Sequence, residues 1–232
     1  MANEIQRLPD GLDCPKLQAL RSQAPNSLLP SNLIKRLKNL ERLQVNGNSV
    51  KEVFGFEGLE LLEENEGELY LGRLREMRLE NLAKLENIWT GPAHLADFSN
   101  LKFVTVTKCK ELSNLFSVSV MSQGLLQLED LWVEDCSKMV EIISNDPGIT
   151  VDVKLPKLKT LCLKKLPMLT GFYPGNAECP SLEYLHVQEC QNFKTATSDF
   201  HSSKQVEEND EQHMKVLKKG YIYVFLISYL NY

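Results

Sequence analysis

The sequence predicts an α/β solenoid, a curved stack of short repeats whose parallel strands form one continuous concave sheet. Three observations predict this fold. First, the pattern LxxLxVxxC, or a close variant of it, occurs six times. Second, the copies follow one another at similar intervals and begin at residues 40, 74, 101, 128, 158 and 182. Third, apolar and other residues alternate inside every copy, which is the period of a half-buried strand.

The copy at residues 128–136, LEDLWVEDC, illustrates how one repeat is expected to fold. Leu131 and Val133 form the buried side of a short strand, because successive strand residues point to opposite faces. Met139 and Ile142 then follow at three-residue steps, which favours a turn-like return. The copies are 34, 27, 27, 30 and 24 residues apart by subtraction. These intervals straddle the roughly 20–29 residues of a leucine-rich repeat, and the longer ones indicate insertions on the convex side.

Four segments of the chain differ in pattern. Residues 1–39 contain degenerate repeats, in which Ser22 stands at a position that should be apolar. Residues 40–194 hold the regular repeats. Residues 195–220 are polar and charged, which favours a linker or a disordered tail. Residues 221–232 are apolar and aromatic.

The last segment, YIYVFLISYLNY, has twelve residues. That is fewer than the roughly 20 residues that a helix needs to span a bilayer. We favour an added strand against the last repeat or an aggregation-prone end. A position at a membrane surface is the less favoured alternative.

The convex side is expected to hold irregular loops and short helices. Residues 31–40, SNLIKRLKNL, carry apolar residues at helical spacing, and Ser31 can act as the N-cap. Residues 57–68 hold six glutamates. We expect a solvated loop there, because like charges repel one another.

The charge of the chain argues against two classes of partner. The formal net charge is -5 at pH 7. An acidic chain has no long-range attraction to phosphates or to anionic lipids. We therefore expect no nucleic acid partner and no membrane partner.

Cysteine positions point to packing rather than to chemistry. Cys109, Cys136 and Cys190 take the last position of their copies, where a small side chain can pack inward and donate a weak hydrogen bond. No CxxC or paired-histidine spacing occurs, so no metal site is expected. Reduced thiols fit the cytosol or the nucleus, and the N-terminus lacks the pattern of a secretory signal. We therefore expect a cytoplasmic protein.

Strand residues that alternate with the buried pair are expected to face the concave surface. Equivalent residues of parallel strands lie side by side, about 4.8 Å apart. The expected triplets are Arg42, Gln44, Asn46; Glu76, Arg78, Glu80; Phe103, Thr105, Thr107; Asp130, Trp132, Glu134; Thr160, Cys162, Lys164; and Tyr184, His186, Gln188. The surface is therefore predicted to be a ladder of six rungs.

Large aromatic residues would be exposed on this polar ladder, and aromatic residues and arginines often dominate interface energies. The candidate protein-binding residues are Arg78, Phe103, Asp130, Trp132, Glu134, Lys164, Tyr184 and His186. Acidic residues around Arg78 suggest a partner with a basic rim around an apolar anchor. Alternatively, Trp132 only packs on its lateral neighbours Thr105 and Cys162.

Catalytic motifs are absent from the sequence. It contains no Gly-x-Ser-x-Gly elbow and no Walker phosphate loop. Cys162 and His186 would lie on neighbouring rungs, but no third residue is placed to orient them as a nucleophile and base. We therefore expect neither an enzyme nor a cofactor site.

Several stretches closely resemble a known repeat family. They are SNLIKRLKNLERLQV, LREMRLENLAKLENIW, LEDLWVEDCSKMVEII and LPKLKTLCLKKLPMLTGFYPGNAECPSLEYLHVQEC. All resemble the leucine-rich repeats of plant intracellular disease resistance proteins, in the class with a coiled coil and a nucleotide-binding domain. The resemblance covers about residues 5–193. It implies a curved solenoid that recognises pathogen effectors or guarded host proteins and holds a nucleotide switch inactive.

The nucleotide-binding motifs of that family have no counterpart in this sequence. The resemblance therefore does not imply ATP binding, and the chain looks like a fragment, a truncated gene product or a repeat-only relative. The leading hypothesis is protein recognition in plant immunity, with an effector, a guarded host protein or a nucleotide-binding resistance-protein domain as the partner. The runner-up is a substrate adaptor of a ubiquitin ligase, although no adaptor-binding box precedes the repeats. A hydrolase that uses Cys162 and His186 is the third hypothesis.

Overall fold

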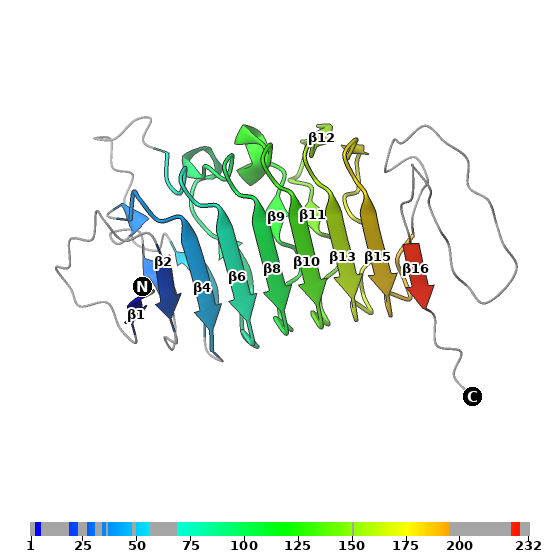
Figure 1. Ribbon diagram of the computed structural model, residues 1–232, viewed down its shortest axis with the longest axis horizontal. Coiled ribbons are helices and arrows are strands. Elements are labelled where there is room, and N and C mark those ends of the chain that lie inside the picture. The colour runs from blue at the N-terminus through cyan, green and yellow to red at the C-terminus, as the bar shows by residue number, and fades with distance from the viewer. Residues whose placement is uncertain are drawn as a thin grey trace, which may run out of the picture.

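The computed structural model describes residues 3–5, 19–22, 27–30, 34–35, 37–47, 50–55, 69–149, 151–194 and 224–227. Its main feature is a nine-stranded parallel sheet, which Figure 1 shows face-on. The strands, in their order across the sheet, are β1 (Asn3–Ile5), β2 (Ala19–Ser22), β4 (Arg42–Asn46), β6 (Glu76–Glu80), β8 (Phe103–Thr107), β10 (Asp130–Glu134), β13 (Thr160–Lys164), β15 (Tyr184–Gln188) and β16 (Val224–Ile227). A stack of parallel strands in chain order is the predicted solenoid.

Each of the six copies forms a five-residue strand that begins two residues after its first leucine. The strands pair without a shift, so that Leu131 lies opposite Val104 on one side and Leu161 on the other. These apolar residues are buried in every copy. The alternation within each copy therefore reflects one buried apolar face. Pairing without a shift joins the faces of successive copies.

A sharp turn follows the strands of the regular repeats. Asn81, Lys108, Asp135, Lys165 and Glu189 each come directly after a strand and have φ between 53° and 57°. Their left-handed backbone turns the chain away from the sheet. For Asn81, Lys108, Asp135 and Lys165, the N–H group donates to the carbonyl of the last residue of the next strand. The turn therefore ties neighbouring repeats together.

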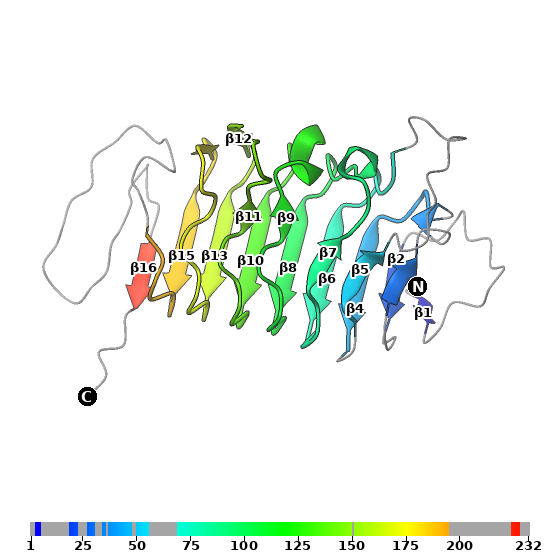
Figure 2. The ribbon, with the colours of Figure 1, turned by 180° about the vertical axis from the view of Figure 1, so that it is seen from behind.

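Smaller parallel sheets form the convex side, which Figure 2 shows from behind. One contains β3 (Ser27–Pro30), β5 (Glu52–Gly55) and β7 (Asn87–Trp89); the two others contain β9 (Phe116–Ser117) with β11 (Ile143–Ser144), and β12 (Val153–Lys154) with β14 (Ala177–Glu178). Two 3₁₀ helices, η1 (Ala93–Leu95) and η2 (Val120–Gln123), complete the described elements.

The short α-helices expected on the convex side are not confirmed. In the described part of residues 31–40, the Leu37 and Leu40 N–H groups donate to carbonyls only three residues earlier, which gives turns. Elsewhere on this side, backbone groups bond to the neighbouring repeat, as Thr90 N–H does to Phe54 O at 3.2 Å. Such bonds satisfy the backbone without a helix. Ser31, the expected N-cap, and the acidic residues 57–68 lie outside the described residues.

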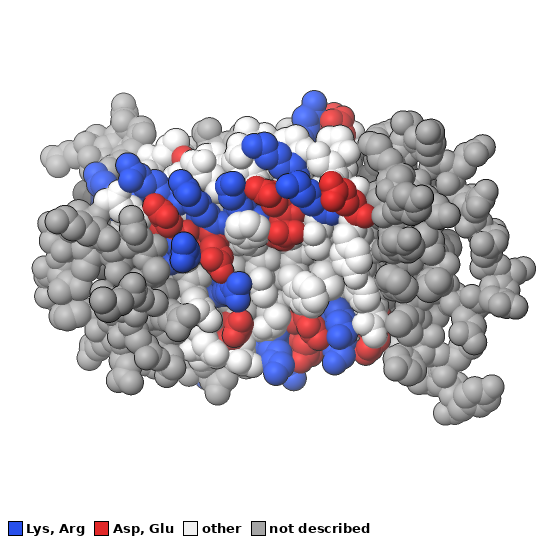
Figure 3. All heavy atoms as spheres, viewed as in Figure 1, with Lys and Arg blue, Asp and Glu red and all other residues white. Residues whose placement is uncertain are grey.

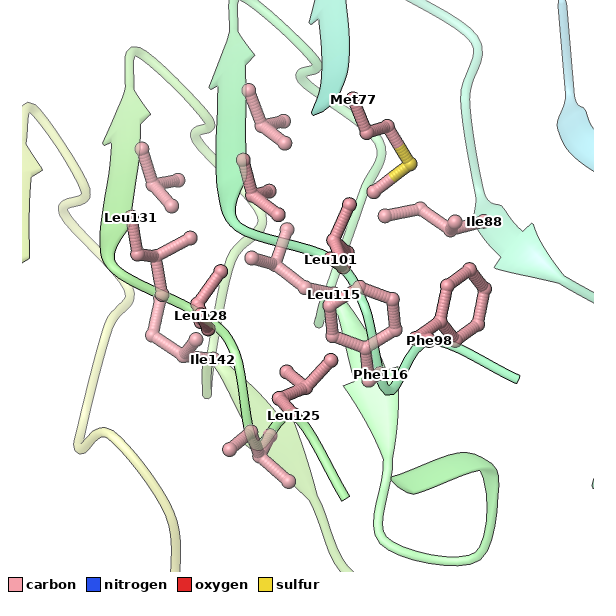
Figure 4. Close-up of a cluster of buried hydrophobic side chains, with 14 of the residues drawn as sticks. Met77, Ile88, Phe98, Leu101, Leu115, Phe116, Leu125, Leu128, Leu131 and Ile142 are labelled. Atoms are coloured by element: carbon pink, nitrogen blue, oxygen red, sulfur yellow. The ribbon is translucent and has the colours of Figure 1, made fainter. Parts of the chain in front are cut away.

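One continuous hydrophobic core fills the space between the two sides. Figure 4 shows Leu101 and Leu128, which precede their strands, packing with Leu115, Phe116 and other residues of the return segments. Close packing of this kind couples each repeat to the next.

The recurrent cysteines lie in this core, as the sequence predicts. Cys109, Cys136 and Cys190 are buried and have free thiols. The Sγ atoms donate to backbone carbonyls, for example from Cys190 to Leu163 O of the neighbouring repeat at 3.6 Å. The thiols therefore pack between repeats and bond weakly to the backbone.

The main sheet continues beyond the regular repeats. β2 pairs with β4, with Leu20 opposite Leu43, and β16 pairs with β15, with Val224 opposite Leu185. Residues 195–220, for which the sequence suggests a linker or tail, lie outside the described residues. In the part of the chain that the structure describes, no helix has the length and apolarity that crossing a membrane requires.

Candidate functional site

The concave face carries three rows of side chains, one from each alternate position of the strands. The first row contains Arg42, Glu76, Phe103, Asp130, Thr160 and Tyr184; the middle row contains Gln44, Arg78, Thr105, Trp132, Cys162 and His186; the last row contains Asn46, Glu80, Thr107, Glu134, Lys164 and Gln188. This is the arrangement that the alternation predicts. All three large aromatic residues of the rows are exposed, with 41% for Phe103, 41% for Trp132 and 37% for Tyr184.

A hollow of about 520 Å³ lies over β8, between β6 and β10. The side chains that line it from the three rows are Glu76, Arg78, Phe103, Thr105, Asp130, Trp132 and Thr160. The register explains its position, because Thr105 lies opposite Arg78 on one side and Trp132 on the other. A small side chain between two long ones leaves space above the sheet.

The two carboxylates that line the hollow, those of Glu76 and Asp130, differ in their ion pairs. The Arg78 Nε–H group donates to Glu76 Oε1 at 2.7 Å, and Arg42 Nε lies 3.9 Å from Glu76 Oε2. Asp130 has no ion pair among the residues that the structure describes. Its carboxylate attracts Lys159 only at longer range and is therefore the one charge of the lining without a direct partner among the described residues.

Trp132 lines this hollow and also bonds to the last row. Its Nε1–H group donates to Glu134 Oε2 at 3.4 Å. Lys164 Nζ lies 3.5 Å from Glu134 Oε1. The structure thus brings Glu134 and Lys164 together beside Trp132 but outside the hollow.

Tyr184 and His186 form a separate pair on β15. Their rings stack with centroids 6.2 Å apart and an interplanar angle of 15°. The Tyr184 Oη and His186 Nδ1 atoms are 3.4 Å apart, and His186 Nε2 lies 3.2 Å from Gln188 Oε1. These contacts place the imidazole between Tyr184 and Gln188 of its own strand.

The uncharged residues form a band on the concave side. In Figure 3, lysine, arginine, aspartate and glutamate gather near both ends of the strands β8 to β15, and other residues lie between these two charged zones. Just before the strands begin, Glu129 lies between two lysines. Its Oε1 atom is 3.2 Å from Lys102 Nζ, and its Oε2 atom is 3.1 Å from Lys159 Nζ. Hydrogen bonds from Lys159 and Lys102 lower the pKa of the Glu129 carboxyl. These three charges before the strands are therefore paired with one another.

Cys162 is the residue of the middle row whose environment differs most from expectation. It lies between Trp132 and His186 in the row and is only 2% exposed. Burial raises the pKa of the Cys162 thiol to about 12. A nucleophilic cysteine needs the opposite shift, because the thiolate is the reactive form. The geometry therefore gives no support to a Cys162–His186 hydrolase.

We expect iodoacetamide to alkylate Cys162 very slowly in the folded chain. A pKa near 12 instead of 9.0 reduces the thiolate fraction at pH 7, by about a thousandfold at one factor of ten per pKa unit. Mass spectrometry of the peptide that contains Cys162, after alkylation with and without urea, measures the ratio. Rapid alkylation in the native state would contradict this picture and return the hydrolase to consideration.

The structure brings together four of the eight predicted site residues in the hollow: Arg78, Phe103, Asp130 and Trp132. Glu76, Thr105 and Thr160 also line the hollow but are not among the candidate residues, although the predicted ladder places all three on the concave face. The signal that could have found them is side-chain size, since a small residue flanked by large ones marks a hollow. In the described residues, no group of three His, Cys, Asp or Glu could hold a metal ion.

Comparison with known proteins identifies the repeats. The family model described as plant disease resistance protein RPS2-like, leucine-rich repeats, matches residues 13–137, which is more than half of the chain. The chain belongs to this family. The RPS2-like match extends from before β2 to just after β10 and includes every lining residue of the hollow except Thr160. The resemblance to the repeats of plant resistance proteins is thereby confirmed.

The chain is also similar to the probable disease resistance protein At4g27220 of Arabidopsis thaliana. The two sequences are 32% identical over an alignment of 126 residues, and the match covers 52% of this chain and 14% of that protein. The chain therefore spans only a small part of the length of this relative.

Proposed function

We propose that the chain is a protein-recognition module of plant innate immunity and that its concave face binds the partner. The partner is a pathogen effector, a guarded host protein or the nucleotide-binding domain of a resistance protein, met in the cytoplasm. The exposure of Trp132, at 41% in the middle of the concave sheet, carries the proposal. A large aromatic side chain half exposed on a rigid sheet is the kind of residue that anchors protein interfaces.

Two further observations support this surface. Phe103 and Tyr184 are exposed on the same face, in the first row. Paired charges surround the uncharged band, as in Lys102–Glu129 and Lys164–Glu134. An apolar centre with a polar rim is typical of protein interfaces. Family membership favours immunity as the setting of this recognition.

We expect Trp132→Ala to weaken capture of the partner by about thirtyfold. Truncating an aromatic anchor often costs about 2 kcal/mol or more of binding free energy, and 1.4 kcal/mol is a factor of ten. The measurement is affinity purification from plant tissue with the wild-type and variant chains, followed by titration of the recovered partner.

Met168→Ala is the matched control for that experiment. Met168 is also apolar and 50% exposed, but it lies in the turn after β13, away from the concave rows. We expect this control to retain the partner and both variants to keep the far-UV circular dichroism of the wild type. Equal capture by Trp132→Ala and wild type would overturn the proposal. Recovery of ubiquitin ligase core subunits instead would favour an adaptor function.

A further inference from the structure

We propose that the hollow over β8 receives an arginine side chain of the protein partner, with Asp130 as its counterion and Trp132 and Phe103 beside the guanidinium. This inference rests on the proposed function and assigns the chemistry of the partner residue. The occupant is an exposed arginine of the partner, presented on a loop or a turn that reaches the concave sheet.

The shape of the hollow suits one long side chain. Its floor is Thr105, and Arg78 and Trp132 rise from the strands on either side. The first row closes one end with Phe103 and Asp130, which are opposite each other on β8 and β10. A volume of about 520 Å³ admits an extended side chain.

The Asp130 carboxylate, which has no direct ion pair among the described residues, determines the charge of the occupant. Glu76, Arg78 and Asp130 are the charged residues of the lining, with net charge -1. Arg78 is already bonded to Glu76 at 2.7 Å. Lys102 and Lys159 near the first row are both engaged by Glu129, at 3.2 Å and 3.1 Å. Asp130 also attracts Lys159 at longer range, but no ion pair joins it to a cation among the described residues. Its carboxylate can therefore pair with a cation of the partner, and it would repel a carboxylate.

The aromatic walls favour arginine over lysine. A planar guanidinium stacks on aromatic faces and can offer two parallel N–H groups to one carboxylate. Trp132 and Phe103 line the hollow and are both 41% exposed, so both can be contacted. An ammonium group is more strongly hydrated and gains less from such walls.

A pair of short peptides tests the inference on the complete chain. The probe is acetyl-Gly-Arg-Gly-amide. In the control peptide, citrulline replaces the arginine, which keeps the shape of the side chain but removes its charge. We expect the arginine peptide to shift the indole N–H resonance of Trp132 saturably and to bind at least about tenfold more tightly than the citrulline peptide. Absence of a saturable shift up to about 10 mM arginine peptide, or equal binding of both peptides, would overturn the inference.

Matched variants identify the counterion. Asp130→Asn is expected to weaken binding of the arginine peptide by at least about tenfold. Glu80→Gln removes the same charge from a neighbouring concave residue that does not line the hollow, and it should change binding little. Equal binding by Asp130→Asn and wild type would remove Asp130 from the site.

A substitution that fills the hollow with a larger side chain tests the site while Arg78, Phe103, Asp130 and Trp132 stay unchanged. Thr105→Tyr places a residue with good strand propensity on the floor, and we expect it to abolish binding of the arginine peptide while the chain stays folded. Retention of full binding would show that the peptide binds elsewhere and would overturn the inference.

Binding of the partner recovered from plant tissue, measured for each variant, distinguishes failure of this inference from failure of the proposed function. If Trp132→Ala loses the partner while Asp130→Asn and Thr105→Tyr both keep it at wild-type affinity, the arginine site is wrong and concave recognition stands. If Trp132→Ala keeps the partner, the proposed function itself fails. Loss of the partner in all three variants, with Glu80→Gln unaffected, supports both.

Discussion

Replacing Leu161 with alanine is expected to lower the free energy of unfolding by about 3 to 5 kcal/mol. Leu161 is fully buried on β13, between Leu131 of β10 and Leu185 of β15. Removal of its side chain loses apolar burial and leaves a cavity. Strands on both sides hold the neighbouring leucines in register, so the cavity can collapse only partly. Urea denaturation followed by circular dichroism measures the change.

Leu126→Ala is the matched control, because this leucine is 45% exposed. Its truncation removes the same atoms but creates no cavity, and we expect a change below about 0.5 kcal/mol. A loss of less than about 1 kcal/mol for Leu161→Ala would contradict a continuous core that is packed through the centre of the solenoid.

The six strands of the regular repeats could be predicted almost residue by residue. Leu131, Val133 and their equivalents are buried in every copy, and the same constraint sets the side chains between them on the concave face. A shift by one residue would expose the whole apolar set. The exposure of Phe103, Trp132 and Tyr184 follows from the same register, so the sequence predicted it.

The convex side was less predictable because its backbone has two ways to satisfy its hydrogen bonds. The apolar spacing of residues 31–40 is compatible with a helix, but it is equally compatible with turns that point the same residues inward. Val53 and Phe54 lie on β5, where the strand bonds to the neighbouring repeats. Contacts between repeats, which the local pattern does not contain, decide between these structures.

Side-chain pairing within the candidate site could not be predicted either. The sequence places Glu76 and Glu80 equally near Arg78 on one strand, and the structure pairs Arg78 with Glu76. Cys162 was expected on the concave surface, yet it is buried between the larger Trp132 and His186. Both outcomes depend on rotamers and on relative side-chain size across strands. The hollow depends on the same factors.

The turn after β13 gives a second prediction with a large effect. Lys165 has φ of 53°, and its N–H group donates to Gln188 O at 2.9 Å. Proline cannot reach a positive φ and has no N–H group, so Lys165→Pro breaks both the turn and the bond between repeats. We expect it to lower the free energy of unfolding by about 3 kcal/mol or more.

Glycine at the same position should act in the opposite direction. A left-handed backbone costs a residue with a side chain roughly 1 to 2 kcal/mol, whereas glycine adopts it freely but loses about 0.5 to 1 kcal/mol through greater entropy when unfolded. We expect Lys165→Gly to raise the free energy of unfolding slightly, by about 0.5 kcal/mol.

Lys165→Ala controls for the loss of charge in both variants, since it keeps a Cβ atom at the same φ. It should stay within about 0.5 kcal/mol of the wild type in urea denaturation. The order Gly above Ala above Pro is the diagnostic result, because charge is lost in all three and only the backbone preference differs. A proline variant as stable as the alanine variant would contradict the left-handed turn and its hydrogen bond to the neighbouring repeat.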